Sequence, residues 1–574
     1  MKTAVKRLRF AALFIALFIL AGIGAPASSA SFIPPVTNMR IGLAHGGGAL
    51  PSANLQNVSA TAYRNFGSGF YFGYFAGGRD FVHIGAYTNV MQITMIRARN
   101  VVWHSGEREY RDGTTGQIVV GGFHIRLNES FGSFDEARIV ADDHSARFAQ
   151  SFVMYDHGQF RVLVGNYTSS QAAANASSSM GLSGTVVEGS AQAISVVETG
   201  TNRILFKFDF GTTHHLGVMP RSLTGEKTET WFRGHRYNGG FQYSRGGANG
   251  NITVINIVDI EDYVKGILPY EMSNTWPLEA LKAQAVTART FAMANLNRHG
   301  SFDLCVSEHC QVYRGRGQAN ARTDQAVDET AGVYITFNGT LVATFYASSN
   351  GGASENVENV WFEALPHLRG VFDPWEAYVA HRIPGYRWRI TYTPAEITQR
   401  LRSRGHNVAT IVSIEVTEYT PTGNVHRVRF IDANGTAWNF RGREPLNSVL
   451  GVPSIRFNIG SARWVGGNIF VNGSDNTIDP GAAFAINGDG TTVALPSGSM
   501  HAITGSGDLG VVSSASEIVG GGDRGMIGGV FVIEGTGRGH NVGMSQWGAY
   551  AMAQYHGKTY RDILHFYFTG VTIG

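Results

Sequence analysis

The order of apolar and polar positions predicts strands in the first third of the chain and a long helix near its middle. Stretches such as FVHIGAY, NVMQITMI and NVVWHSG are rich in β-branched and aromatic residues, as strands are. Residues 117–200 follow the order strand, helix, strand, strand, helix, because FHIRL and FRVLVGNY are strand-like whereas SFDEARIVA and SSQAAANA have helical spacing. We therefore predict a multi-domain α+β protein, rich in strands, with a small α+β module inserted before a central Ala-rich helix.

The central helix should begin near Thr275, which is a plausible N-cap. Pro277 suits the first turn of a helix. Further along this helix, Lys282 and Arg289 are seven residues apart, so they project from nearly the same angle. These two side chains could face a cleft that holds an anionic substrate, or they could form a solvated basic stripe.

Glu271 lies just before this helix, after an apolar run that ends at Pro269 and Tyr270. Partial desolvation between Tyr270 and Trp276 could raise the pKa of its carboxyl group enough for acid catalysis. A glutamate in a turn is, however, usually a solvated group or a partner of the helix dipole. The residues alone leave both interpretations open.

Length and composition narrow the class of protein. The chain of 574 residues is long enough for about two to four domains. It contains 73 glycines and only 16% charged residues, which is typical of a turn-rich, secreted protein with much β structure. The net charge of +3 is too small to indicate nucleic-acid binding, but it is compatible with an anionic polymer of the cell envelope.

The first 30 residues have the layout of a secretory signal peptide. Basic residues precede an apolar run from Phe10 to Ile23, and small residues follow up to Ala30. The run is short for a membrane span, which needs about 20 residues, so cleavage is favoured over retention as an N-terminal membrane anchor. We expect the mature protein to lie outside the cytoplasmic membrane, secreted or in the cell envelope.

The chain contains only two cysteines, Cys305 and Cys310. In a secreted protein two nearby thiols can form a disulfide, although so short a loop gains little loop-closure entropy. Together with His309 they could instead supply three ligands to a zinc ion, with the fourth ligand from elsewhere or from water. Free thiols are the third alternative.

Two stretches resemble the signatures of one family. The run YVKGILPYEMSNTWPLEALKAQAVTARTFA, which contains Glu271, closely resembles that of the stage II sporulation protein D family, and GRGHNVGMSQWGA matches the family's other strong signature. The family includes peptidoglycan lytic transglycosylases and amidase-enhancer proteins. The resemblance implies that Glu271 is the catalytic acid/base and that no cofactor is required for catalysis. Some members of the family bind zinc through Cys/His at the place of Cys305, His309 and Cys310, so a structural zinc and a disulfide both stay open here.

Further segments contribute candidate substrate-binding residues. The family shows a similar pattern of Ser, Gly-Gly and Glu to that in ATFYASSNGGASENVENVW, and HCQVY is one of its recurring elements. Small polar groups interleaved with aromatic side chains suit the binding of sugars. The candidates are Lys282, Arg289, Gln311, Tyr313, Ser348, Ser349, Gly351, Gly352, His540, Ser545 and Gln546.

These observations predict a domain order along the chain. The predicted parts are a signal peptide (1–30), the first part of the catalytic domain (38–116), a glycan-binding module (117–200), the catalytic core (204–460), a Gly/Ser-rich insertion (461–527) and the closing part of the core (528–574). The module is similar to the sporulation-related repeat domain, which binds glycan strands without stem peptides.

The resemblance implies a secreted lytic transglycosylase. Such an enzyme cleaves the strand between N-acetylmuramic acid and N-acetylglucosamine and leaves 1,6-anhydro ends. The alternative is a noncatalytic wall-binding enhancer of an N-acetylmuramoyl-L-alanine amidase. We expect peptidoglycan glycan strands, and in the second case a cell-wall amidase, as partners, and no nucleic acid.

Overall fold

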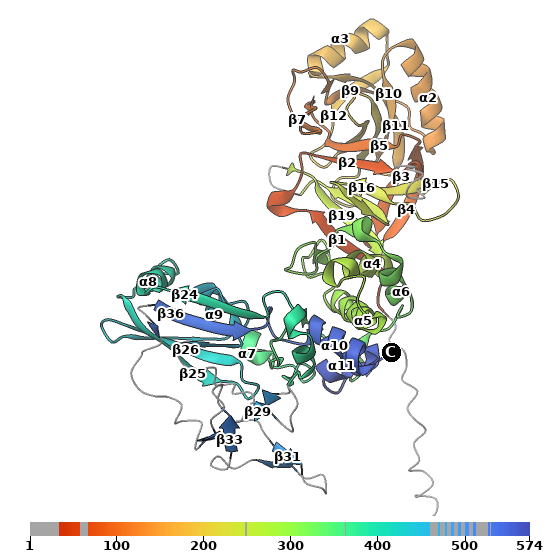
Figure 1. Cartoon of the computed structure of the whole chain (residues 1–574). Coiled ribbons are helices and arrows are strands. Elements are labelled where there is room, and N and C mark those ends of the chain that lie inside the picture. The colour runs from red at the N-terminus through yellow and green to blue at the C-terminus, as the bar shows by residue number, and fades with distance from the viewer. Residues whose placement is uncertain are drawn as a thin grey trace, which may run out of the picture.

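The computed structural model shows the arrangement of the chain (Figure 1). It describes residues 34–57, 67–246, 250–361, 363–459 and 530–574, together with short strands between residues 469 and 527. The predicted signal peptide and most of the predicted insertion lie outside the described residues. Within the described ranges, no helix combines the length and apolar composition that a membrane crossing needs.

A seven-stranded sheet supports the middle of the molecule. Its order is β20 (Leu304–Cys305), β1 (Asn38–Ala44), β19 (Thr253–Asp259), β18 (Gly240–Ser244), β15 (Leu216–Ser222), β3 (Gly67–Ala76) and β4 (Asp80–Thr88). The central strand β19 is buried at every position except its last, as its Val- and Ile-rich sequence predicts. It pairs antiparallel with β1 and β18, so strands from the start of the described chain and from residues 216–259 lie side by side in one sheet.

The segment predicted as a glycan-binding module forms part of a larger sheet. Its first five elements follow the predicted order: β9 (Phe123–Leu127), α2 (Phe134–Arg147), β10 (Ser151–Asp156), β11 (Gln159–Tyr167) and α3 (Ser170–Met180). A further strand that was not predicted, β12 (Gly184–Glu188), follows them. The strand order β12-β9-β11-β10 is that of the ferredoxin-like βαββαβ motif, and both helices cover the outer face (Figure 1). Ser133 starts α2 with a capping box, and Ser169 caps α3.

The sheet that contains this module extends beyond it by six further strands. The sheet has ten strands, and beyond β10 it runs through β14 (Ile204–Asp209), β13 (Ile194–Glu198), β5 (Gln92–Arg97), β2 (Ser52–Asn57), β16 (Thr230–Phe232) and β17 (His235–Tyr237). Since β2 and β5 come from residues before the module, the predicted parts 38–116 and 117–200 share one sheet.

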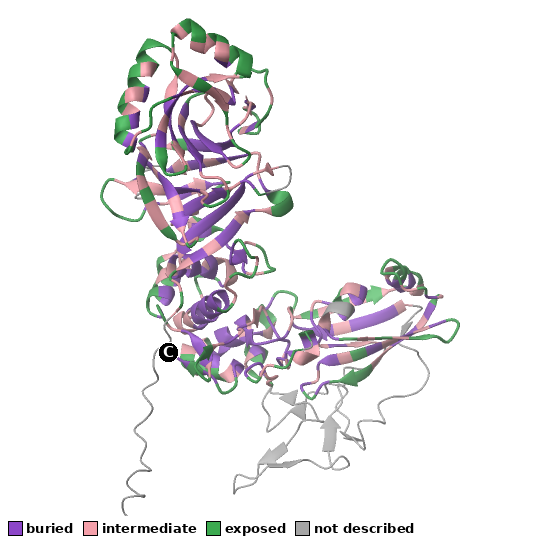
Figure 2. Ribbon diagram, turned by 180° about the vertical axis from the view of Figure 1, so that it is seen from behind, coloured by how far each residue is buried: buried purple, intermediate pink, exposed green. Residues whose placement is uncertain are grey.

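Below the sheets lies a group of helices around the predicted central helix. α5 spans Leu278–Ala294 and is buried on almost every side, as the purple ribbon in Figure 2 shows. Its N-cap is Pro277 rather than the predicted Thr275, and no side chain caps it. α4 (Ile260–Glu271), α6 (Ala321–Asp328), α10 (Gln546–His556) and α11 (Tyr560–Tyr567) pack against α5 or one another.

The predicted catalytic core of residues 204–460 contains a second unit with its own hydrophobic core. We call residues 387–459 and 530–536 the distal unit. It consists of β24 (Arg387–Tyr392), α8 (Pro394–Arg402), β25 (Ile411–Tyr419), β26 (Val425–Asp432), β27 (Ala437–Arg441), α9 (Arg443–Leu450), β28 (Phe457–Ile459) and β36 (Val530–Thr536). β36 lies between β24 and β28, so the closing segment of the chain completes this unit. The α+β, multi-domain fold class is confirmed.

Candidate functional site

A cleft of about 980 Å³ collects residues from both sequence signatures. Its walls come from the end of α4, the loop of residues 308–312, residues 343–348, α7 (Glu358–Trp361), the start of α9 and the segment of residues 538–546. Among the predicted site residues, Glu271, His309, Cys310, Gln311, Ser348, His540 and Gln546 line this cleft. Residues about 270 positions apart in sequence therefore meet at one site.

Glu271 is the last residue of α4, which differs from the predicted position in a connection before the central helix. The apolar run that precedes it is helical, because Asp259 caps its start by accepting bonds from two N–H groups. The helix ends at Glu271, and the N–H group of Met272 donates to the carbonyl of Leu268. The carboxylate of Glu271 thus extends from a helix end into the cleft.

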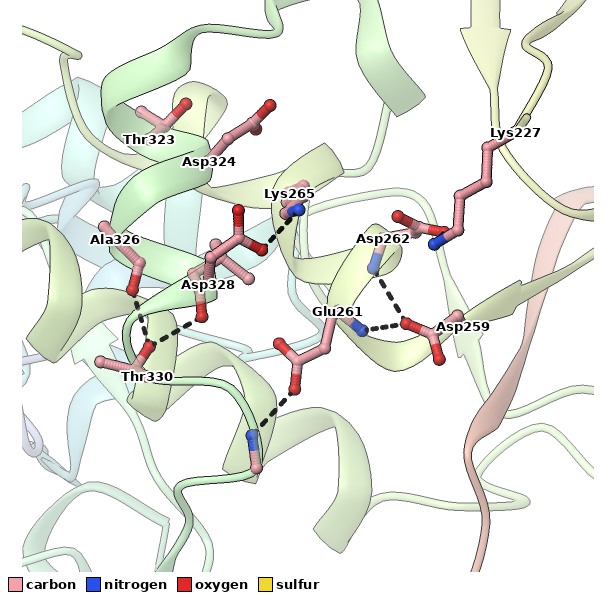
Figure 3. Close-up of polar contacts among 12 residues, drawn as sticks. Lys227, Asp259, Glu261, Asp262, Lys265, Thr323, Asp324, Ala326, Asp328 and Thr330 are labelled. Atoms are coloured by element: carbon pink, nitrogen blue, oxygen red, sulfur yellow. Dashed lines mark hydrogen bonds and ion pairs between the residues drawn. The ribbon is translucent and has the colours of Figure 1, made fainter.

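Polar contacts at the far end of α4 hold this helix in place (Figure 3). Besides the cap from Asp259, Lys227 lies 2.7 Å from Asp262 and Glu261 accepts from a backbone N–H group 3.1 Å away. Both acidic residues are close to Glu271 in sequence, but they lie at the opposite end of the helix. They anchor α4 and do not line the cleft.

The surroundings of Glu271 raise the pKa of its carboxyl group, so this group keeps its proton to a higher pH than usual. Burial raises its pKa, and the nearby charge of Glu308 raises it further. Hydrogen bonds from Tyr346, Gln546 and the backbone at Val312 act in the opposite direction, because they stabilise the carboxylate. The net direction is upward. A group of this kind can serve as an acid and then accept a proton.

Tyr346, which sequence reasoning missed, belongs to a chain of hydrogen bonds that reaches Glu271. Tyr263 donates to the side-chain oxygen of Gln311 at 3.2 Å, and the amide of Gln311 donates to the hydroxyl of Tyr346 at 3.3 Å. Tyr346 is in turn bonded to Glu271. Its position two residues before the predicted Ser348 was the only signal in the sequence, since a tyrosine in a strand is usually a packing residue.

Gln546 contacts Glu271 from the second signature. Its amide nitrogen lies 3.5 Å from a carboxylate oxygen of Glu271 and 3.5 Å from the side-chain oxygen of Gln284. Gln284 is completely buried on α5 and orients this amide. Gln546 is the first residue of α10, which begins where β37 (Met544–Ser545) pairs with β23 (Tyr346–Ala347). That strand pair joins the second signature to the segment that carries Tyr346 and Ser348.

Lys282 and Arg289 do not reach the cleft. Arg289 is fully buried, and its guanidinium bonds both carboxylate oxygens of Glu261 at 2.9 and 3.0 Å from Nε. Lys282 lies 2.8 Å from Glu279 and 2.7 Å from Glu329. The prediction that both face an anionic substrate assumed one open side on α5, whereas neighbouring elements cover that helix and neutralise both charges.

Other predicted substrate-binding residues shape the cleft from behind. Tyr313 is buried, and its hydroxyl donates to Asn256 at 2.9 Å. Ser349 donates to the buried carboxylate of Glu376 at 2.8 Å, and Ser545 donates to the same carboxylate. Ser545 also caps α10 by accepting from a backbone N–H group. These groups are occupied inside the protein, whereas Ser348 lines the cleft.

Gly351 and Gly352 form a turn that passes close to the distal unit. Both have positive φ angles, +72° and +115°. A Cβ atom on Gly351 would lie 2.6 Å from the carbonyl oxygen of Thr536 at the end of β36. The backbone N–H of Gly351 donates to Glu376 at 2.9 Å. The two glycines therefore permit a close backbone approach and do not contact the cleft space.

His540 lies in the cleft beside aromatic rings. Its ring centroid is 5.0 Å from that of Trp361, which is 4.8 Å from Phe345. Burial and the charge of Arg443 lower the pKa of His540 to about 4, so the ring is neutral at pH 7. Its Nδ1 accepts from the backbone N–H of Val542 at 3.1 Å. It can therefore offer a neutral ring, rather than a positive charge, to a ligand.

The two cysteines lie beside two histidines at one edge of the cleft. The ligand atoms of His299, Cys305, His309 and Cys310 all lie within 4.8 Å of one another. Cys310 Sγ is 3.3 Å from His299 Nε2 and 3.5 Å from His309 Nδ1, and no disulfide joins the two cysteines. Two thiols and two imidazoles are a complete ligand set for tetrahedral zinc.

His299 was missed in the sequence because it lies before the Cys/His loop, five residues after the end of α5 at Ala294. The loop between them is held by Asp303, whose carboxylate is 2.8 Å from Arg79 and 3.2 Å from Arg40. A wider search for histidine around the cysteines would have included His299, but the sequence does not reveal which way this loop folds.

Comparison with known proteins agrees with this geometry. Residues 248–337, which contain Glu271, match the family model described as Stage II sporulation protein. The chain is 31% identical over 328 residues to an uncharacterized protein of Brachyspira hyodysenteriae, covering 57% of this chain and 69% of that protein.

Two Bacillus subtilis proteins are also similar. Stage II sporulation protein D is 26% identical over 340 residues, 56% of this chain and 76% of that protein. The amidase enhancer is 26% identical over 323 residues, 54% of this chain but only 40% of the enhancer. The matching segment includes the helix that ends at the cleft carboxylate, and the chain belongs to the stage II sporulation protein D family.

Proposed function

We propose that this protein is a secreted lytic transglycosylase that cleaves the glycan strands of peptidoglycan, with Glu271 as the catalytic residue. The observation that carries the proposal is a half-buried carboxyl group at a helix end in a large cleft, with its pKa raised by burial. The names of two similar proteins, a stage II sporulation protein D and an amidase enhancer, support a role at the cell wall. The predicted signal peptide would direct the protein across the cytoplasmic membrane, to be released or to remain anchored there if the signal is not cleaved.

In the proposed reaction, neutral Glu271 donates its proton to the bridging oxygen between N-acetylmuramic acid and N-acetylglucosamine. The bond from muramoyl C1 to that oxygen breaks. The resulting carboxylate takes the proton of the muramoyl C6 hydroxyl, whose oxygen bonds to C1 and closes the 1,6-anhydro ring. Glu271 is then protonated again, and no water is consumed.

One carboxyl group suffices for this reaction, whereas glycoside hydrolysis usually needs two. Glu308 and Glu363 also line the cleft, but both are exposed to solvent. An exposed carboxylate is hydrated and lacks the burial that raises the pKa of Glu271. Glu261 and Glu279 are paired with cations elsewhere. Transglycosylation is therefore the better-supported reaction.

We further propose that His299, Cys305, His309 and Cys310 hold a structural zinc ion. The zinc would fix the loop of residues 299–310, whose end, at Glu308 to Cys310, lines the cleft. With four protein ligands the ion has no open position for water, so a part in catalysis is not expected.

The test is a digestion of peptide-free glycan strands with the wild type, Glu271→Gln and Glu308→Gln, with products identified by mass spectrometry. The wild type should release fragments with 1,6-anhydromuramoyl ends, and Glu271→Gln should lose about 10²–10⁴-fold in rate, the usual contribution of an acid/base residue. Glu308→Gln, the matched control, should form the same products. Absence of anhydro ends, or equal rates for the wild type and Glu271→Gln, would contradict the proposal.

The second candidate function is a noncatalytic, wall-binding enhancer of an N-acetylmuramoyl-L-alanine amidase. Similarity to the Bacillus subtilis amidase enhancer favours it. In that case the wild type and Glu271→Gln should accelerate a purified wall amidase equally, and neither should release anhydro-ended fragments.

A further inference from the structure

The cleft continues into a smaller recess between the second signature and the distal unit. This recess has a volume of about 390 Å³ and is lined by Asn447, Gly451, Val452 and Pro453 together with three residues that also line the cleft: Arg443, Arg538 and Gly539. Two arginines therefore stand where cleft and recess meet. Neither the acid/base chemistry nor the zinc site uses them.

The backbone around these arginines is firmly held. Arg538 exchanges two backbone hydrogen bonds with Ser349, at 2.9 and 3.1 Å. The next residue, Gly539, donates its N–H to the carbonyl of Pro453 at 3.0 Å and accepts from Nε of Arg443 at 3.4 Å. Arg443, the first residue of α9, is thus bonded to the chain neighbour of Arg538, and both arginines line the cleft and the recess.

Both guanidinium groups have donors to spare. Among the residues that the structure describes, neither arginine forms an ion pair with a carboxylate, and only Nε of Arg443 donates a side-chain bond, to a backbone carbonyl. Burial lowers the pKa of Arg443, and no neighbouring carboxylate offsets this effect. A partly buried cation without a counter-ion is unfavourable, and an incoming anion would remove that cost.

Beside the arginines lies an aromatic surface. Trp361 is 37% exposed and contacts the rings of Phe345 and His540. The face of an indole ring is suited to the apolar face of a sugar. His540 lies close enough to Arg443 for that charge to lower its pKa. A sugar on Trp361 would thus lie near the guanidinium group of Arg443.

We propose that Arg443 and Arg538 form a carboxylate-binding subsite of the cleft, which takes the lactyl carboxylate of an N-acetylmuramoyl residue while a sugar ring stacks on Trp361. This inference rests on the proposed function, since it names the feature of the glycan strand that the cleft recognises. The planar guanidinium fork matches a carboxylate with two parallel hydrogen bonds.

This subsite has a consequence for substrate choice. The lactyl carboxyl group is free only where the stem peptide has been removed, because in peptide-bearing strands it is part of an amide bond. The reaction that supplies the preferred substrate is therefore hydrolysis of that amide. Neutral oligomers of N-acetylglucosamine, which have the same sugar backbone without lactyl groups, should gain nothing from the arginines.

The test measures binding in the Glu271→Gln background, in which turnover does not interfere. Affinity is measured for peptide-free strands, for the same strands with their carboxylates converted to methylamides, and for N-acetylglucosamine oligomers. Arg443→Gln and Arg538→Gln should each weaken binding of the first ligand about tenfold or more, the effect of one charge-assisted hydrogen bond. Binding of the two neutral ligands should change less than about twofold.

Arg404→Gln is the matched control, because Arg404 is an exposed arginine of the distal unit outside the cleft. If Arg443→Gln fails to fold, the Arg538→Gln variant and the methylamide strands still test the carboxylate-binding subsite. Equal affinity of the unmodified protein for charged and amidated strands would overturn the subsite. If binding depends on the arginines but the protein with Glu271 intact forms no anhydro-ended products, the proposed reaction is refuted and the subsite stands. If anhydro-ended products form but binding does not depend on the arginines, the subsite is refuted and the proposed reaction stands.

Discussion

Replacing Tyr346 with phenylalanine should shift the pH dependence of strand cleavage upward. The hydroxyl of Tyr346 bonds to Glu271 and favours its carboxylate form, so its removal raises the pKa of Glu271 above its already raised value. Glu271 must be protonated to donate to the glycosidic oxygen, and its protonated form would then persist to higher pH. The alkaline limb of kcat/KM should move to higher pH.

The size of this shift follows from the bond that is lost. A hydrogen bond to a charged group contributes about 1.5–3 kcal/mol, and one to a neutral group about 0.5–1.5 kcal/mol. The difference between carboxylate and carboxylic acid is therefore about 1–1.5 kcal/mol. Since one pKa unit corresponds to about 1.4 kcal/mol, the limb should move by about one pH unit.

The assay is the release of anhydro-ended fragments from soluble glycan strands, measured as kcat/KM across the pH range. Tyr313→Phe is the matched control, because it removes the same hydroxyl from a buried tyrosine whose bond goes to Asn256. Its limb should stay with that of the wild type. An unchanged limb in Tyr346→Phe, or a shift to lower pH, would refute the assignment of this hydrogen bond to Glu271.

Three further outcomes are expected. Treatment with a chelator should lower the Tm, and added zinc should restore it. The variant Cys305→Ser should bind less than one equivalent of zinc. An unchanged Tm in a protein that contains no bound metal would contradict the zinc site. Glu355→Ala should lower the free energy of unfolding, measured in urea, by about 3 kcal/mol. The buried carboxylate of Glu355 accepts hydrogen bonds from two residues of the distal unit, Thr420 at 2.6 Å and Thr422 at 2.7 Å. A decrease below about 1 kcal/mol would contradict this role. Gly351→Ala should cost about 2 kcal/mol or more, because positive φ is combined with a close contact, whereas the same change at an exposed glycine with positive φ and open surroundings should cost about 1 kcal/mol.

Sequence reasoning located the parts of the site better than their connections. The strand and helix order of residues 117–200 follows from local periodicity, and the central helix follows from its alanines, so both were predictable. The helical state of the run before Glu271 was not, because Pro269 lies inside α4 and argues locally against a helix. The tertiary packing of α4 on the sheet overrides that local preference.

The roles of individual predicted site residues depend on long-range partners that no local pattern reveals. Ser349 and Ser545 look like sugar ligands in the sequence, yet both donate to Glu376, a buried carboxylate on a short helical turn far from either signature. Burial and the charge of Asp373 raise the pKa of Glu376 to about 7. Small polar residues suit a glycan and suit a buried carboxylate equally well, so only the fold decides between these roles.

Hydrogen bonds to the carboxylate of Glu376 explain how one cleft is built from distant segments. The Ser/Gly-Gly turn and the start of α10 meet on this carboxylate, which fixes the neighbouring Ser348 and Gln546 as cleft-lining groups. β36 of the distal unit ends at Thr536, two residues before Arg538. The backbone of Arg538 is bonded to Ser349 in the Ser/Gly-Gly segment, so the distal unit is linked directly to the backbone that carries this arginine. The carboxyl group of Glu271 and the two arginines of the proposed subsite are therefore connected through buried polar contacts of residues that do not line the cleft.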